Sequence, residues 1–295
     1  MLCLHPWCSL GGGAKDWEAV LDHPAVNITG EPRNVILPVL ADLGELGALA
    51  LDFPTYAISP AALNRLMGAC PCLYAQIPVR VTAEGVVHLC EVTLGEAVNS
   101  NNVSLAFDIQ HPNKPESPYA FPPLEPGAGG GDIMEALCAA TLLAAGVPRM
   151  QVAADGWPIW TSPSFVSLNR GKLLHLKMYG DFLIPCAPHN LFVSVKSEAA
   201  RERLLLSGNR LESVGFGFFN DASEFWTASR IRLYKRWGFS AIYMPTETLA
   251  QLNQKLFDTG LMSAALNQNG KPLYRDLEAF GGEMCAIAGR STFEL

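Results

Sequence analysis

The residues best suited to covalent chemistry are Cys186 and His189, which lie three positions apart in the proline-containing loop 185–190. A thiolate activated by a histidine is a familiar catalytic nucleophile. Such pairs are usually brought together from distant parts of a chain, so closeness in sequence is weak support. We therefore expect no catalytic residues, and keep Cys186 with His189 as the alternative if the chain is an enzyme.

Two pairs of cysteines raise the question of a metal site. Cys3 and Cys8 are separated by four residues, and Cys70 and Cys72 by one. Structural zinc sites often combine two cysteine pairs, usually with two to four residues inside each pair. Because free cysteine is also a common core residue, we expect no metal or other cofactor. The alternative is zinc held by these four thiolates.

The segment 225–237 combines cations with aromatic residues. Its four cations are Arg230, Arg232, Lys235 and Arg236. Interleaved cations and aromatic rings can bind phosphate or stack on bases. We interpret these four residues as a candidate anion-binding group. Contacts with the chain's own acidic residues or with a protein are the competing interpretation.

A proline- and glycine-rich stretch divides the chain at residues 111–131. Glycines before a helix can form a phosphate-binding loop. Here no strand precedes the glycines and no lysine follows in the required place, so neither nucleotide-binding fingerprint fits. The stretch predicts a linker or surface loop between a domain at 1–110 and a second domain at 132–295.

The net negative charge of the chain lies in its first part. Residues 1–110 hold 4 Lys and Arg against 11 Asp and Glu, and the remainder holds 17 of each kind. An acidic surface repels phosphates, which disfavours nucleic acid as a partner. It can attract a basic protein, so we expect a protein partner through the acidic N-terminal surface.

The composition is that of a folded protein outside the membrane. Apolar residues make up 49% of the chain, and no apolar run reaches the length of a membrane span. Eight cysteines without a secretion signal indicate a reducing compartment. We expect a cytoplasmic protein that does not enter the membrane.

One small unit recurs three times: an apolar stretch, a helix-starting residue, an amphipathic run and a closing glycine. The copies cover residues 56–68, 192–208 and 243–260. Each predicts a strand that leads directly into a helix. These modules, with antiparallel elements among them, predict an α+β fold with mixed or antiparallel sheets in two packed subdomains.

Other patterns predict the remaining elements. Residues 77–94 read as a hairpin, residues 102–110 alternate like a half-buried strand, and two further strands are expected at 173–179 and 211–219. Asp132 and Glu135 resemble a capping box at the start of a nearly all-apolar helix, 133–145. Gly146 and Pro148 would end that helix.

The segment from Asn190 to Phe216 resembles a module of bacterial immunity proteins from polymorphic-toxin systems. Its features are the strand residues Phe192-Val193-Ser194, then Leu204 and Gly208, then Val214-Gly215-Phe216. Residues 50–66 are similar to an earlier module of one such group, the double-CXXCG immunity proteins. The cysteine knuckles that name this group are absent. The resemblance implies a cytoplasmic, non-enzymatic binder that neutralises a cognate toxin by covering its active site.

Three hypotheses for function follow. The leading one is a non-enzymatic protein-binding module, of the immunity type. The second is an enzyme acting on a small anionic or nucleotide-like substrate, with the cations of segment 225–237 near Cys186 or His189. The third is a structural subunit of an assembly, which six tryptophans would suit.

Overall fold

The computed structural model describes part of the chain, in ranges separated by gaps. These are residues 16–24, 26–30, 33–34, 37, 83, 87, 90–91, 94–110, 130–198, 204 and 211–290. The chain divides into two compact units. The first comprises Met1–Ala97 and Leu105–Ile133, and the second Val98–Ser104 and Met134–Leu295.

In the first unit, α1 (Trp17–Asp22) begins at Asp16, whose side chain accepts a hydrogen bond from the Ala19 amide at 3.1 Å. The described residues between 83 and 94 are helical, so the hairpin expected at 77–94 is wrong for them. Ala83, Val87 and Cys90 are buried at the spacing of one helical face. The Cys90 thiol donates to the Ala106 carbonyl oxygen at 3.5 Å.

The strand expected at 102–110 is also wrong, because these residues form α6 (Val103–Gln110). Val103, Ala106 and Phe107 are buried, whereas Leu105 is 54% exposed. Buried positions separated by three and four residues define a helical face. The same apolar residues therefore fit both periods, and the helix is the one that forms.

The second unit contains a six-stranded mixed sheet with the strand order β1-β2-β3-β4-β5-β6. β1, β2 and β3 pair antiparallel, and β3 to β6 pair parallel. This confirms the expected mixed sheet with strand-to-helix units. The strands are β1 (Val166–Ser167), β2 (Phe182–Ile184), β3 (Leu191–Lys196), β4 (Ser213–Gly217), β5 (Phe239–Met244) and β6 (Tyr274–Asp276).

Helices follow the parallel strands in turn. β4 leads through η3 (Ala222–Glu224) to α9 (Ala228–Arg236), β5 leads to α10 (Thr246–Asp258), and β6 leads to α11 (Leu277–Ala288). β5 and α10 confirm the predicted module at 243–260, which closes at Gly260 with φ +68°. In the module at 192–208 the strand is confirmed, and Leu204 is helical and buried. The module at 56–68 lies outside the described residues.

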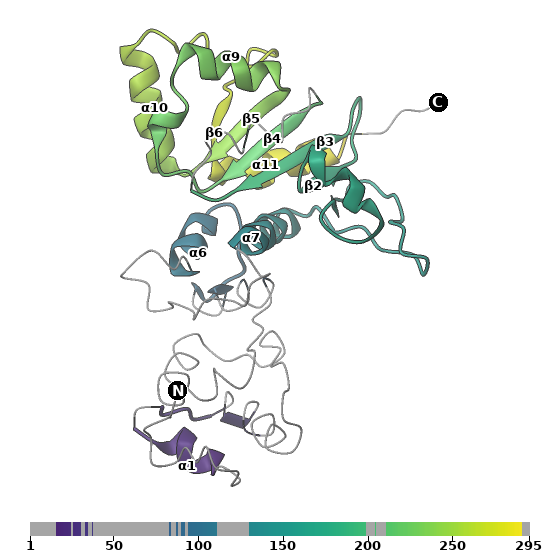
Figure 1. Ribbon diagram of the computed structural model, residues 1–295, viewed down its shortest axis with the longest axis vertical. Helices are drawn as coiled ribbons and strands as arrows, with labels where there is room; N and C mark the ends of the chain where they lie inside the picture. The colour runs from purple at the N-terminus through teal and green to yellow at the C-terminus, as the bar shows by residue number, and fades with distance from the viewer. Residues whose placement is uncertain are drawn as a thin grey trace. The chain divides into compact units, whose positions relative to one another are not determined.

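The two faces of the sheet carry different partners (Figure 1). Ile242 and Met244 of β5 belong to a buried cluster with Leu252 and Leu256 of α10. Tyr243 lies between them in sequence and therefore points to the opposite face. There its ring packs 5.1 Å from Phe280 of α11, centroid to centroid. Figure 1 shows α9 and α10 on one side of the sheet and α11 on the other.

Two further elements differ from expectation. Residues 173–179 do not form a strand but belong to the 3₁₀ helix η2 (Gly171–Tyr179), in which Leu173 is buried and Leu176 partly buried. A separation of three residues matches the 3₁₀ repeat. The apolar helix is α7 (Gly130–Ala144), and it starts two residues before Asp132. Asp132 therefore lies in the first turn and is not the capping residue.

Gly146, with φ +82°, follows the end of α7 as predicted. The strand expected at 211–219 is confirmed as β4. Among the helices that the structure describes, none combines the length and apolar character needed to cross a bilayer.

Candidate functional site

Cys186 and His189 meet in the loop between β2 and β3, but not as an activated pair. The Cys186 thiol donates to the backbone carbonyl oxygen of His189 at 3.0 Å, whereas His189 itself is exposed. Burial raises the pKa of the Cys186 thiol, and the charge of Glu212 raises it further. A nucleophilic thiolate requires a lowered pKa. The surroundings of Cys186 therefore favour the neutral thiol.

The predicted anion-binding cations lie on α9, which begins where Thr227 caps the Arg230 amide at 3.3 Å. Three of them donate to carbonyl oxygens of their own chain. Arg230 reaches Glu224 at 2.7 Å, Arg232 reaches Ala228 at 3.2 Å, and Lys235 reaches Ala264 at 3.2 Å. Arg236 is exposed. These contacts tie Arg230 and Lys235 to neighbouring segments of the fold.

The four cysteines of the alternative zinc site, Cys3, Cys8, Cys70 and Cys72, lie outside the described residues. Within the part of the chain that the structure does describe, no three His, Cys, Asp or Glu side chains are grouped as metal ligands.

A cleft of about 840 Å³ lies in the second unit. Its lining comes from the strands β4, β5 and β6, the connection before β6, and the helices α10 and α11. The last residues of β4, β5 and β6 do not line it. Ligands of open parallel sheets usually bind outside the carboxyl ends of the strands. This cleft is lined instead by residues within the strands and in the connection before β6.

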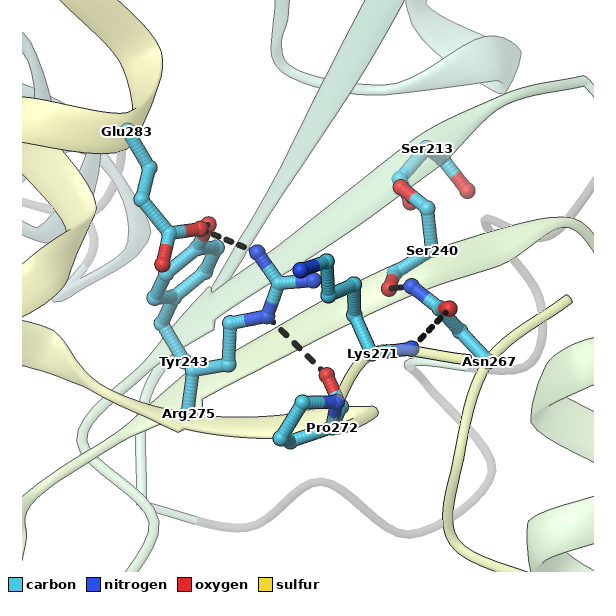
Figure 2. A network of polar contacts seen from close by, with 8 residues as sticks. All are labelled: Ser213, Ser240, Tyr243, Asn267, Lys271, Pro272, Arg275 and Glu283. Atoms are coloured by element: carbon cyan, nitrogen blue, oxygen red, sulfur yellow. Dashed lines mark hydrogen bonds and ion pairs between the residues drawn. The ribbon is translucent and has the colours of Figure 1, made fainter. Parts of the chain in front are cut away.

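The polar floor of the cleft is a network of three side chains from β5, β6 and α11 (Figure 2). The Tyr243 hydroxyl donates to Glu283 at 2.5 Å, and the Arg275 guanidinium forms an ion pair with the same carboxylate oxygen. Arg275 Nε also donates to the Pro272 carbonyl oxygen at 3.0 Å. Burial, followed by the hydrogen bond to Glu283, raises the pKa of the Tyr243 phenol well above its usual range.

Asn267 shapes the wall of the cleft. Its side-chain amide donates to the Ser240 carbonyl oxygen at 2.8 Å, and its Oδ1 accepts from the Lys271 amide at 3.0 Å (Figure 2). Ser240 sits where the pairing of β4 with β5 shifts register, so its carbonyl is turned away from the regular ladder. Asn267 thus connects the irregular position of β5 at Ser240 with the backbone of Lys271.

This arrangement is better suited to binding than to proton transfer. Glu283 already accepts from both Tyr243 and Arg275, so its charged form is satisfied. A general base needs a proton-accepting group directed at a substrate, with a pKa near the working pH. Tyr243 is held neutral, and Arg275 remains a cation.

A second feature of the second unit is the segment Gln151–Trp160, here called the tryptophan loop. The loop folds back on itself: the Ala153 amide donates to the Trp157 carbonyl oxygen, and the Ile159 amide to that of Gln151, both at 2.8 Å. It exposes four large apolar side chains, of which Val152 is 63%, Trp157 47%, Ile159 46% and Trp160 55% exposed.

η2 lies beside the tryptophan loop and exposes two further apolar side chains. Leu174 and Met178 are exposed on it. The two segments are adjacent, because a Cβ placed on Gly156 would lie 3.4 Å from the Lys172 side chain. Large exposed apolar patches on a folded protein mark sites of interaction.

Sequence reasoning singled out neither of these two places. Tyr243 and Glu283 are 40 residues apart and match no motif. For the tryptophan loop a pattern was present: Trp157 and Trp160 flank Pro158-Ile159 in a stretch without helical or strand periodicity.

No known protein family, curated protein or solved structure matches this chain.

Proposed function

We propose that the protein is a non-enzymatic protein-binding module and that the tryptophan loop is its principal contact surface. The observation that carries the proposal is the exposure of Trp157 and Trp160 on a hydrogen-bonded loop. Tryptophan is enriched among the residues that dominate binding energy at protein interfaces.

The exposed apolar area of the tryptophan loop gains no burial in the isolated chain and would gain it in a complex. Full burial of one large apolar side chain is worth roughly 1.5–3 kcal/mol. The loop hydrogen bonds hold its backbone in place, so less conformational freedom is lost when a partner binds. A partner with an apolar groove would thus recover stabilisation that the isolated protein leaves unused.

Within this proposal, the partner is a protein toxin that the module neutralises by covering its active site. Two features support a toxin as the partner. Residues 190–216 resemble a module of immunity proteins, and residues 1–110 are acidic. A basic partner would be steered toward that acidic part before the apolar contact forms. Such a module would act in the cytoplasm.

Site-specific photocrosslinking tests the proposal. A photoreactive amino acid replaces Trp160, and a matched chain carries it at Phe257, which is 73% exposed on α10. In extract of the source organism we expect a covalent adduct with one protein from position 160 only. That protein, identified by mass spectrometry and purified, should bind the wild-type chain and lose at least about tenfold affinity for Trp160→Ala, or about 1.4 kcal/mol.

Three outcomes would contradict the proposal. Equal adducts from positions 160 and 257 would indicate non-specific contact. A crosslink from position 160 to the chain itself would show that the loop is covered internally. A crosslink between copies would support the assembly-subunit hypothesis instead.

A further inference from the structure

The cleft has the size and lining of a small-molecule site. Its volume of about 840 Å³ lies within the range of ligand pockets, roughly 300–1,000 Å³. Apolar side chains line it from α10, α11 and the connection before β6, among them Leu249, Ile287 and Met262. A few charged groups stand among these apolar walls, which is the usual composition of a ligand site.

Cations outnumber carboxylates in this lining. Lys271, Arg275 and Arg290 face Glu212 and Glu283. Only one of these carboxylates, Glu283, is engaged with a cation of the cleft among the described contacts, and it also accepts from Tyr243. The cleft therefore has an excess of positive charge in a chain whose net charge is −7.

Arg275 is held so that part of its guanidinium remains available. Nη1 pairs with Glu283, and Nε donates to the Pro272 carbonyl oxygen. Nη2 has no hydrogen-bond partner among the described residues, and the side chain is 20% exposed. Two fixed contacts orient the planar group before any ligand arrives, so little conformational freedom is lost on binding.

Lys271 brings a second cation to the same place. Its backbone amide is fixed by Asn267 (Figure 2), and Lys271 lines the same cleft as Arg275. Two cations that line one cleft are both attracted to an anion that binds there. A planar fork beside a flexible ammonium is a suitable grip for a phosphate or a carboxylate.

We propose that this cleft binds a small organic anion, with Lys271 and Arg275 holding its charged group and the apolar wall holding its body. The site differs from the cationic group expected on α9, whose Arg230 and Lys235 already donate to backbone carbonyls. It is also independent of the tryptophan loop, so either proposal can fail without the other.

Isothermal titration of the full chain tests the site with three ligands that share an aromatic body: phenyl phosphate, phenylacetate and neutral benzyl alcohol. We expect saturable 1:1 binding of at least one anion and much weaker binding of the alcohol. A preference for phenyl phosphate or for phenylacetate identifies the charged group. Affinity should fall as salt rises, because the contact is ionic.

Lys271→Gln is the informative variant, because Lys271 is exposed and its loss should not impair folding. We expect it to weaken anion binding about tenfold, the effect of losing one charge-assisted contact. Arg232→Gln removes an exposed cation from α9, outside the cleft, and should leave binding unchanged. Arg275→Lys keeps a positive charge beside Glu283 but loses the planar guanidinium fork. It should therefore weaken anion binding, while circular dichroism should show that the chain is still folded.

Three results would overturn the site. One is no binding of either anion up to about 10 mM, the range of very weak complexes. Another is equal binding of the neutral alcohol, which would make the cleft a purely apolar pocket. The third is an equal loss for Arg232→Gln and Lys271→Gln, which would reduce the effect to net charge.

Discussion

The polar floor of the cleft and the tryptophan loop lie in the same unit, but they differ in which kind of side chain is buried and which is exposed. In the floor, Tyr243, Arg275 and Glu283 bring polar groups into a largely buried place and satisfy one another. In the loop, Trp157 and Trp160 bring apolar groups to the surface, where the described chain offers them little cover. The floor is stabilised mainly by contacts within the protein, whereas the exposed tryptophans gain stability mainly from contact with a partner.

The difference separates stability from binding. Side chains of the floor are packed into the sheet, so changing them should cost folding free energy. Side chains of the loop contribute little to folding, so changing them should affect a partner and leave the fold intact.

The sharpest contrast is between Tyr243→Ala and Trp160→Ala. Tyr243 is fully buried against Phe280, and truncating a buried aromatic residue costs about 3–5 kcal/mol of unfolding free energy. Trp160 is 55% exposed, so its loss should cost no more than about 0.5 kcal/mol. Urea unfolding followed by circular dichroism measures both. Equal losses would show that the loop is part of the folding core.

Alkaline pH should weaken the fold through three buried tyrosines. Burial raises the pKa of Tyr234 to about 12, and burial raises the pKa values of Tyr243 and Tyr274 well above their usual range. These phenols stay neutral in the folded chain and ionise near pH 10 in the unfolded chain. Their contribution is therefore complete below pH 10 and is lost as pH rises above it.

Each of these tyrosines should remove about 1 kcal/mol of stability between pH 10 and 11, where ionisation of the unfolded phenol goes from half to nearly complete. Tyr243→Phe should reduce the loss by one such increment, and Trp160→Ala should leave it unchanged. Urea unfolding at several pH values from 8 to 11 gives the slopes, and comparison with Tyr243→Phe removes the contribution of the buried cysteines. An unchanged slope in Tyr243→Phe would contradict the buried, neutral state of this phenol.

A smaller effect is expected from Glu283→Gln, which weakens two contacts of the floor at once. The ion pair with Arg275 is partly exposed, 35% on the Glu283 side, so its share is modest. Because the substitution also weakens the hydrogen bond from Tyr243, we expect a total loss of about 1–2 kcal/mol in the free energy of unfolding. In a double-mutant cycle with Tyr243→Phe, the two losses should overlap by about 0.5–1 kcal/mol. Fully additive losses would show that the hydroxyl and the carboxylate do not act together.

The elements predicted correctly from the sequence are those whose ends are marked by particular residues, such as a proline before a helix or a glycine after it. The 243–260 module has an apolar strand, a proline before the helix and a closing glycine, and each of these determines backbone geometry locally. The errors occur where one apolar pattern fits two periods. At 103–110 the alternation of Val103, Leu105 and Phe107 indicated a strand, but Val103, Ala106 and Phe107 also share a helical face.

The cleft could not be predicted in the same way. Tyr243, Arg275 and Glu283 come from β5, β6 and α11. The pairing of β5 with β6 sets Tyr243 opposite Arg275, and α11 adds Glu283. Their contact depends on register, which no short pattern specifies. Anion binding was expected from clustered cations on α9, because clustering is visible in a sequence, whereas the convergence of Lys271 and Arg275 depends on the fold of the segment fixed by Asn267.

The smallest expected effect comes from Gly156→Ala in the tryptophan loop. Gly156 has φ +85°, a conformation that costs an L-residue about 1 kcal/mol, while the added Cβ would make only ordinary contact with Lys172. Gly282→Ala in α11 is the matched control, because its φ is not positive and nothing lies within 4 Å of the new Cβ. It should be neutral or stabilising by up to about 1 kcal/mol, since alanine favours helix.

Partner affinity then decides what the shape of the loop is for. If the hydrogen-bonded turn preorganises Trp157 and Trp160, Gly156→Ala should lower the affinity for the partner identified by crosslinking several-fold. Gly282→Ala should leave that affinity unchanged. Urea unfolding and titration with that partner give the two quantities for both variants. A loop that binds through its side chains alone would show the loss with Trp160→Ala and none with Gly156→Ala, and the preorganised geometry would then have no part in binding.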